Sequence, residues 1–524
     1  MNKTIYIYDT TLRDGGQMEG VSFSVNSKIL ILKKLINFGV DFIEGGWPGS
    51  NPKDEEFFKK IKKDKFKNVV AFSATHMVGK TPANDPLIQK ILEAETKWIC
   101  LFGKTWDLHT RKILKISDKN ALNLIQDTIK FFKQKNKNVI FDAEHFFDGF
   151  KSNPKFALDC LKVASKSGAW NLTLCDTNGG AQEKELREII KLVKKEIKNP
   201  FIIANTANLR LGIHTHNDCG IAVANSLAAV DEGVELIQGT FNGIGERSGN
   251  ANLGTIISNL QIKQNYKIIP QKNFKKLTQL SNFIFESANL PPQKNQPFVG
   301  ASAFTHKGGI HASAVKKISK SYEHINPELV GNLSRVTISE LSGKSNVVEV
   351  ARRLGFRLDP KSPRVRAILQ QVKKMESEGF YFETAEASFA LLILRSQKKY
   401  QAPFEVLDYS VVNLKSGEAK AMVKLKVGKE VCEYMASGNG PVNALDIATR
   451  RAVEKFFPQV KKVELKDYKV RILDSEAATA AKTRVLIESS NGMESWNTVG
   501  CSENIIEASW QALVDSLEYA IFKT

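Results

Sequence analysis

The chain has 524 residues and a mass of 58.4 kDa, and its 75 Lys+Arg against 56 Asp+Glu give a formal net charge of +19. Hydrophobic residues make up 42% and charged residues 25%, which excludes wholesale disorder and, at this length, predicts about two to four domains. The positive charge favours a nucleic-acid binder, but lysine supplies most of it, and zinc-finger, helix-turn-helix and RNA-recognition signatures are missing. We therefore expect no nucleic-acid partner.

Cysteine spacing and the N-terminal segment predict the compartment. The six cysteines include no Cys-x-x-Cys pair, which is typical of reduced thiols in a cytosolic protein. The first eight residues run directly into a strand pattern and carry no targeting signal. No segment approaches the roughly 18 consecutive apolar residues that a membrane span needs. We expect a cytoplasmic protein with no membrane partner.

Short apolar runs alternate with amphipathic helical patterns from the N-terminus to about residue 265. Eight strand–helix units in about 260 residues predict an α/β chain whose catalytic domain, at 1–265, is a (β/α)8 TIM barrel. A doubly wound open sheet is the alternative, but the first predicted strand lacks the Gly-rich phosphate turn of that fold. The predicted strands are Thr4–Asp9, Phe42–Gly45, Val69–Ala74, Trp98–Phe102, Asn138–Asp142, Asn171–Cys175, Leu211–His214 and Leu236–Thr240. The predicted helices include Ser27–Asn37, Asn120–Gln134, Pro154–Ser165, Gln182–Lys195, Ile221–Asp231 and Asn252–Ile262.

The rest of the chain is predicted to form two further parts. Residues 266–400 are less regular and are interpreted as linker or lid subdomains, with helical patterns near 343–355 and 362–377. Residues 401–524 are predicted to form a duplicated α+β regulatory domain, since Ala419–Phe457 and Ala481–Ile521 both show strand, strand, turn and helix patterns. Such a pseudo-symmetric module is typical of dimerisation or effector binding.

The strongest chemical signal is His214-Thr215-His216, at the end of the seventh predicted strand. Residues two apart on a strand face the same side, so both imidazoles point into the barrel mouth, where catalytic residues of such barrels lie. Two histidines on one strand form half of a metal site, although a chance pair is the alternative. Asp14 follows the first strand and is a candidate oxygen ligand. Asn250, in a Gly-rich loop after the eighth strand, offers a further amide oxygen.

Other polar residues at predicted strand ends have candidate catalytic roles. Arg13 could neutralise a bound or developing anion, and Asp9 is better explained as a strand cap or a structural partner of Arg13. Glu144, after the fifth strand, could orient a proton or a metal-bound water, or it could be a buried Glu paired with an Arg. Thr177, after the sixth strand, could donate a hydrogen bond to a substrate carboxylate.

In this order, the motifs resemble those of the metal-dependent Claisen-condensing barrels, a family that includes the 2-isopropylmalate, homocitrate and citramalate synthases. The stretches that carry the resemblance are DTTLRDGGQ at 9–17, EGGWPGSNPKD at 44–54, FGKTWDLH at 102–109, FDAEHFFDG at 141–149, LCDTNGG at 174–180, HTHNDCGIAVANS at 214–226, GIGERSGNANL at 243–253 and GNGPVNALDIA at 438–448. The second, third and fourth look most like the citramalate-forming branch. The resemblance covers nearly the whole chain, and the last stretch is similar to the effector-binding domain of the family.

The resemblance assigns roles to individual residues. It implies that Asp14, His214, His216 and Asn250 hold a divalent metal (Mg, Mn, Zn or Co). It also implies that Arg13, Glu144 and His311 are catalytic and that Arg13, Thr177 and Gln17 bind substrate. The base assignment departs from the family pattern: the leucine-pathway branch has Gln-Asp after the His aligned with His311, whereas this chain has Ala312-Ser313, so His306 is a rival.

The resemblance further implies acetyl-CoA as co-substrate, pyruvate as acceptor and citramalate as product, on the isoleucine route. Isoleucine is the expected effector of the C-terminal domain, which is also expected to contribute to a homodimer. The alternatives are a larger α-keto acid that gives 2-isopropylmalate or homocitrate, a lyase running in reverse, and an inactive barrel. Two histidines and one carboxylate also fit non-haem iron oxygenases, which usually have other folds.

Overall fold

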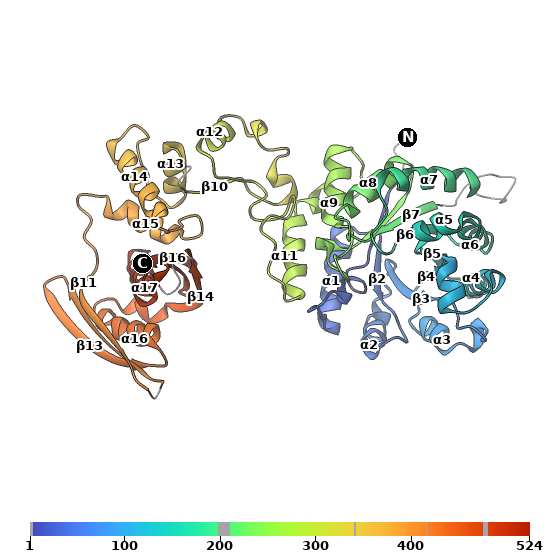
Figure 1. The fold of residues 1–524 in the computed structure, drawn as a ribbon, viewed down its shortest axis with the longest axis horizontal. Coiled ribbons are helices and arrows are strands. Elements are labelled where there is room, and N and C mark those ends of the chain that lie inside the picture. The colour runs from blue at the N-terminus through green and yellow to red at the C-terminus, as the bar shows by residue number, and fades with distance from the viewer. Residues whose placement is uncertain (1–3, 198–209, 340–341, 416, 475–479, 524) are drawn as a thin grey trace. The chain divides into compact units, whose positions relative to one another are not determined.

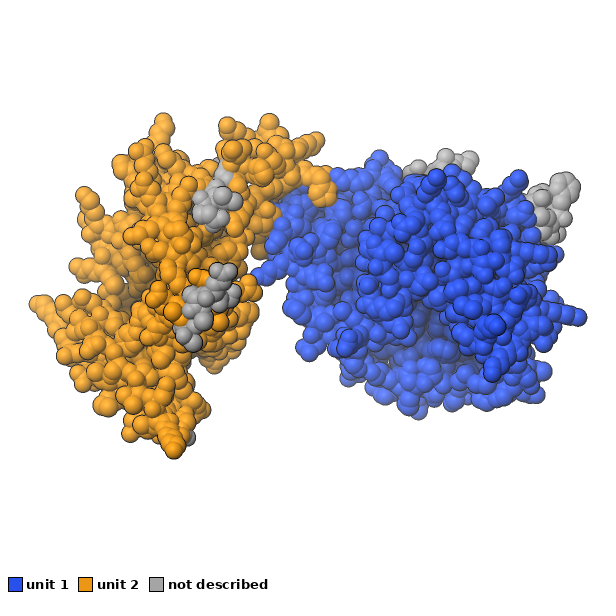
Figure 2. Space-filling view, viewed as in Figure 1, with its two compact units in different colours: residues 1–304, 325–333 blue, residues 305–324, 334–524 orange. Residues whose placement is uncertain are grey.

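The structure is a computed structural model that describes residues 4–197, 210–339, 342–415, 417–474 and 480–523. It contains two compact units, shown in different colours in Figure 2. The first comprises residues 1–304 and 325–333, and the second comprises 305–324 and 334–524. Neither unit ends at residue 265 or 400, so the three-part division expected from the sequence stays a prediction.

Eight parallel strands close into a barrel, because β1 pairs with both β2 and β8. This closure confirms the TIM barrel and rules out the open sheet. Each predicted strand overlaps one of the eight. The strands are β1 (Tyr6–Asp9), β2 (Phe42–Gly46), β3 (Val69–Ala74), β4 (Trp98–Lys104), β5 (Asn138–Glu144), β6 (Asn171–Asp176), β7 (Arg210–Thr215) and β8 (Leu236–Gly239).

Helices lie around the barrel strands (Figure 1). Their apolar side chains are buried in one core with those of the strands. Several begin at side-chain caps, which satisfy backbone donors of the first turn: Ser24 caps α1, Ser117 caps α4 and Asn153 caps α6. The helices of this layer are α1 (Val25–Phe38), α2 (Pro52–Ile61), α3 (Pro86–Glu93), α4 (Asp118–Gln134), α5 (Phe146–Ser152), α6 (Pro154–Lys166), α7 (Glu183–Ile197), α8 (Ala222–Asp231) and α9 (Leu253–Ser258). Two further helices, α10 (Gln271–Phe274) and α11 (Leu277–Ser287), follow in the first unit.

The second unit begins with a short helical region and ends with two antiparallel sheets. Its first part contains β9 (Thr305–His306), α12 (Gly309–Lys317), β10 (Arg335–Val336), α13 (Lys344–Arg353), α14 (Pro363–Ser377) and α15 (Glu386–Arg395). Helices α13 and α14 match the helical patterns that the sequence predicts near 343–355 and 362–377. Their buried side chains form a core with those of α15.

The C-terminal part of the second unit repeats one arrangement of three strands and a helix, so the predicted duplication is present. The first half contains β11 (Glu405–Asn413), β12 (Ala419–Val427), β13 (Glu430–Gly438) and α16 (Pro441–Glu454). The second half contains β14 (Glu464–Ile472), β15 (Thr483–Ser490), β16 (Ser495–Ser502) and α17 (Ile505–Lys523). The predicted order lacked the first strand of each half. Gly438 and Gly500 hold equivalent places, since a Cβ on either would collide with the backbone of the helix that follows.

Two findings bear on the expected compartment. All six cysteines are free thiols. Among the helices of the described ranges, none is both long and apolar enough to cross a membrane.

Candidate active site

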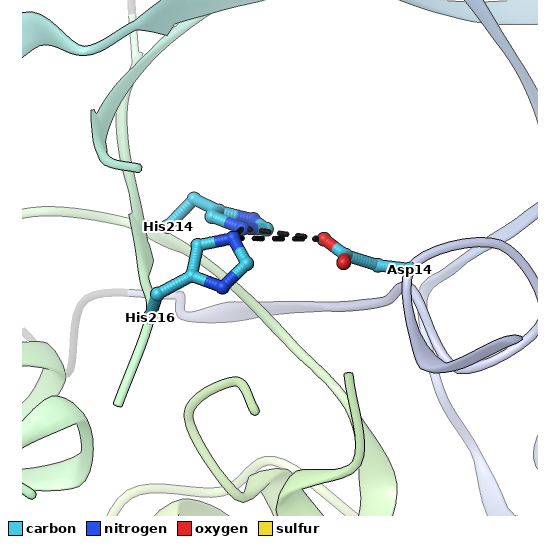
Figure 3. A group of neighbouring side chains, drawn as sticks. All are labelled: Asp14, His214 and His216. Carbon is cyan, nitrogen blue, oxygen red and sulfur yellow. Dashed lines mark hydrogen bonds and ion pairs between the residues drawn. The ribbon is translucent and has the colours of Figure 1, made fainter. Parts of the chain in front are cut away.

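Asp14, His214 and His216 meet at the carboxyl ends of the barrel strands, and their side chains point toward one another (Figure 3). His214 and His216 lie on and just after β7, with their Nε2 atoms 3.3 Å apart. Asp14 lies in a tight turn after β1, and its Oδ2 is 3.5 Å from His214 Nε2 and 4.0 Å from His216 Nε2. All three side chains are buried.

Asn250 is brought to the same cluster by the loop that follows β8. Its backbone forms a bridge with His216, and its amide nitrogen donates to the carbonyl oxygen of Ile244 at 3.4 Å. Glycines make this fold of the loop possible: a Cβ on Gly245 would strike the Asn250 amide, and one on Gly249 would strike the Gly243 carbonyl. The glycines therefore make room for the Asn250 side chain beside the two histidines.

These four residues fit a divalent cation. Ligand atoms bound at about 2.0–2.2 Å lie about 3 Å apart in octahedral and about 3.5 Å apart in tetrahedral geometry. The distances from His214 Nε2 to His216 and Asp14, 3.3 and 3.5 Å, match this, and the distance from His216 to Asp14 is longer, at 4.0 Å. The Oδ1 atom of Asn250 is buried and accepts no hydrogen bond from the described protein. A buried polar atom without a partner is costly, and a cation would satisfy this one.

The charges around this cluster favour the ligating forms of its side chains. Burial, together with the neighbouring His216, lowers the pKa of His214 to about 4, so the imidazole is neutral at physiological pH. Burial alone would raise the pKa of Asp14, but Arg13 and the two histidines outweigh it, and the pKa is lowered. The carboxylate is therefore ionised, as a hard cation requires.

Arg13 lies beside this cluster and is held by a carboxylate that the sequence motifs did not single out. Its Nε donates to Glu44 Oε1 at 2.5 Å, and Glu44, on β2, is fully buried. Tyr8 donates to the other oxygen of Glu44 at 2.6 Å. Burial alone would lower the pKa of Arg13, but Glu44 and Asp14 raise it, so the guanidinium stays charged.

Asp9 has the structural role that the sequence analysis favoured. Its carboxylate accepts hydrogen bonds from the backbone nitrogen and hydroxyl of Thr11, at 3.1 and 2.7 Å. Burial raises its pKa to about 7, although both of these hydrogen bonds lower it. Asp9 therefore caps the end of β1, while Arg13 pairs with Glu44 and Asp14.

The candidate substrate-binding residues line one cavity of about 220 Å³ together with Asp14, His214 and His216. Thr177 Oγ1 accepts a hydrogen bond from the backbone nitrogen of His145 at 2.8 Å, and Gln17 Oε1 accepts one from Arg13 Nη1 at 3.3 Å. Glu144 forms an ion pair with Lys104, with Oε2 and Nζ 2.5 Å apart. The partner of Glu144 is therefore a lysine rather than the arginine of the structural alternative.

The two candidate bases, His311 and His306, belong to the second compact unit. His311 lies on α12, is exposed and stacks on Tyr322 with 4.2 Å between ring centroids. His306 lies on β9, and its Nε2 is 3.3 Å from Glu323 Oε1. His311 is thus the more accessible of the two, while the ring of His306 lies against the Glu323 carboxylate.

Sequence reasoning missed several residues that contact the site. Glu44 holds Arg13, Lys104 pairs with Glu144, and Gln238 contacts His214. Lys104 is the last residue of β4, so the strand-end rule that found His214 could also have found it. Glu44 lies in the middle of β2, where that rule does not apply. Gln238 lies within β8 and carries no comparable signal.

Models of three protein families match the chain and together span most of it. Residues 4–284 match the HMGL-like family, residues 298–379 match the homocitrate synthase post-HMGL domain-like family, and residues 383–521 match the LeuA allosteric (dimerisation) domain. The first match covers the barrel and more than half of the chain. The last covers both halves of the duplicated module.

Relatives match over nearly the full length. The (R)-citramalate synthase of Aquifex aeolicus is 51% identical, with 100% of this chain and 99% of the relative covered. That of Geobacter sulfurreducens is 48% identical, with 99% and 98% covered. The 2-isopropylmalate synthase of Methanocaldococcus jannaschii is 30% identical, with 99% and 95% covered. With the barrel and its metal-ligand cluster in place, these matches show that the chain belongs to the HMGL-like family and, within it, to the (R)-citramalate synthases.

Proposed function

We propose that the chain condenses acetyl-CoA with pyruvate to give (R)-citramalate and coenzyme A. The observation that carries this proposal is the buried cluster of Asp14, His214 and His216 in one cavity with Arg13 and Thr177. When bound there, with Asn250 as a fourth ligand, a divalent cation (Mg, Mn, Zn or Co) would supply Lewis-acid chemistry and a template for the keto acid.

The acceptor is oriented by residues of the barrel. Thr177 accepts its hydrogen bond from His145 through Oγ1, so its hydroxyl proton is free to be donated to the carboxylate of pyruvate. Arg13, fixed by Glu44, presents a guanidinium to the keto oxygen and stabilises the negative charge that develops there. Gln17 contacts Arg13 at the rim of the cavity and is a further substrate-binding residue.

The reaction joins two carbons and then cleaves the thioester. A general base removes a proton from the methyl group of acetyl-CoA, and the resulting carbanion attacks the keto carbon of pyruvate. The electron pair of the carbonyl moves to its oxygen, which takes up a proton to become the hydroxyl of the product. Water then cleaves the thioester, releasing a carboxylate and the thiol of coenzyme A. We assign the base to His311, with His306 as the rival, and assign Glu144 to positioning the reacting groups.

Thiol release from acetyl-CoA over a panel of α-keto acids, with Mg, Mn, Zn and Co in turn, tests this function. We expect kcat/KM to be highest for pyruvate, and no activity without a divalent metal. A preference for 2-oxoisovalerate or 2-oxoglutarate would instead favour 2-isopropylmalate or homocitrate formation. Absence of thiol release with every acid and metal would identify an inactive barrel.

We further propose that the duplicated module binds isoleucine and forms part of a homodimer, and that the enzyme works in the cytoplasm. Support comes from the match of residues 383–521 to an allosteric (dimerisation) domain and from the six free thiols. The same assay tests the effector when isoleucine, leucine or valine is added. Inhibition by leucine rather than isoleucine would contradict the proposed effector.

A further inference from the structure

The metal-ligand candidate His214 contacts Gln238 through the ring nitrogen that does not face the cluster. The two residues are register partners on β7 and β8, and Gln238 Oε1 lies 2.9 Å from His214 Nδ1. Gln238 is completely buried, and His214 is 5% exposed. The opposite ring atom, Nε2, faces Asp14 Oδ2 at 3.5 Å. Gln238 therefore contacts the side of the imidazole that points away from the metal-ligand cluster.

The hydrogen-bond partners on the other side of the Gln238 amide determine which of its two polar atoms faces His214. Its Nε2 donates to Asp142 Oδ1 at 2.7 Å and to Thr173 Oγ1 at 3.2 Å. The hydroxyl of Thr173 donates its proton to Asn171 Oδ1 at 2.8 Å, which leaves its lone pairs to accept from the Gln238 amide nitrogen. Because an amide nitrogen donates and an amide oxygen accepts, these partners leave Oε1 facing His214.

We propose that Gln238 is a positioning residue that holds His214 in the tautomer with its proton on Nδ1. Oε1 carries no proton, so Nδ1–H must donate, and the lone pair of Nε2 then points toward Asp14 and His216. The other tautomer would place a proton among the ligand atoms. Partners behind a ligating histidine fix its tautomer and ring orientation, and their loss typically weakens metal affinity about 10- to 100-fold.

This inference rests on the proposed function only in taking Asp14, His214 and His216 as the metal site. Its tests therefore measure metal binding and the histidine tautomer rather than turnover. A chain that binds metal without releasing thiol would contradict the proposed function and leave the role of Gln238 intact.

The first test replaces Gln238 by Met, which has nearly the same shape and cannot accept the hydrogen bond. Calorimetric titration of the full chain with Zn²⁺ is expected to give a Kd at least about tenfold weaker than wild type. The control is Gln261→Met, which removes an amide that, among the described residues, bonds to the backbone of Ile269 alone. This variant should leave the Kd unchanged. An unchanged Kd for a folded Gln238→Met variant would overturn the proposal.

A second test exchanges the amide donor of Gln238 and the carboxylate acceptor of Asp142 between the two positions. In the double variant Gln238→Glu/Asp142→Asn, the new carboxylate accepts from His214 Nδ1 and from the new amide, at unchanged net charge. The hydroxyl of Thr173 turns its proton from Asn171 toward the same carboxylate. We expect the zinc affinity lost in Gln238→Met to be recovered. A folded double variant that binds as weakly as Gln238→Met would contradict a positioning role, since the conservative exchange preserves the acceptor that His214 needs.

The tautomer can also be observed in the unaltered protein, so the proposal does not depend on any variant folding. Long-range ¹⁵N–¹H correlation spectra of the metal-free chain with ¹⁵N-labelled histidine distinguish the two tautomers. The signal that disappears in His214→Gln identifies the residue. We expect a proton on Nδ1 of His214, and a proton on Nε2 would overturn the proposal.

Discussion

Three aromatic side chains, Trp47, Phe72 and Phe102, line the cavity that also contains Arg13 and Asp14. The indole of Trp47 meets the rings of Phe72 and Phe102 edge-on, with centroids 5.5 and 5.6 Å away, and the two phenyl rings stack at 5.2 Å. The guanidinium carbon of Arg13 lies 3.9 Å above the centroid of Phe72. The apolar rings therefore lie directly against the Arg13 guanidinium. A keto acid whose carboxylate or keto oxygen is held by Arg13 would meet these rings at once, which favours an acid with a short side chain.

We expect Trp47→Ala to relax the preference for pyruvate, because it removes the largest of these three aromatic side chains. A methylene group in an apolar pocket contributes about 1–3 kcal/mol to discrimination, so the kcat/KM ratio of pyruvate to 2-oxoisovalerate should fall at least about tenfold. Steady-state assays with both acids measure the ratio, and Trp47→Phe is the conservative control. A ratio that stays at the wild-type value in Trp47→Ala would show that another group limits the acceptor.

Between elements, a half-buried carboxyl group connects the first two barrel strands. Asp41, just before β2, accepts a hydrogen bond from the backbone nitrogen of Ile7 on β1 through Oδ2 at 2.9 Å. Burial raises its pKa to about 6 from an ordinary value of 3.8, although this hydrogen bond lowers it. Between these two values the folded protein binds more protons than the unfolded chain, so rising pH destabilises the fold through this group.

The variant Asp41→Asn removes that pH dependence and keeps an oxygen acceptor for Ile7. Its melting temperature relative to wild type should rise from about pH 4 to about pH 6 and then level off. Thermal unfolding followed by circular dichroism at several pH values measures the difference, and the exposed Asp64→Asn controls for the loss of one negative charge. A difference that does not change over this range would show that ionised Asp41 is not destabilising in the folded barrel.

The barrel strands could be predicted from the sequence because they are buried on both faces and form continuous apolar runs. Strands β11 and β14 could not be predicted, since each lies at the edge of its sheet and is largely exposed, without the alternation of buried and exposed residues that identifies β12.

At the site, the strand-end rule found Asp14 and His214. It could not find Gln238. This residue contacts His214 because the two are paired in register on β8 and β7, and the sequence does not show the register of strand pairing.

At the scale of the whole molecule, the duplicated module leaves apolar side chains of an edge strand uncovered. Val470 on β14 pairs in register with the buried Val485 and is 42% exposed, and Ile472, on the same side of the strand, is 60% exposed. Contiguous exposed apolar residues mark interaction sites in soluble proteins. Because residues 383–521 match a dimerisation domain, we propose that a second copy of the chain covers these side chains.

We therefore expect a homodimer that depends on this strand. Size-exclusion chromatography with light scattering should give a mass close to twice the 58.4 kDa of one chain. Ile472→Glu should shift the mass toward that of a monomer, because burying an unpaired carboxylate in an apolar contact is strongly unfavourable. Met493→Glu introduces the same charge at a 90% exposed position in the turn between β15 and β16, and should leave the dimer intact. If Ile472→Glu also stays dimeric, the contact between copies lies elsewhere on the chain.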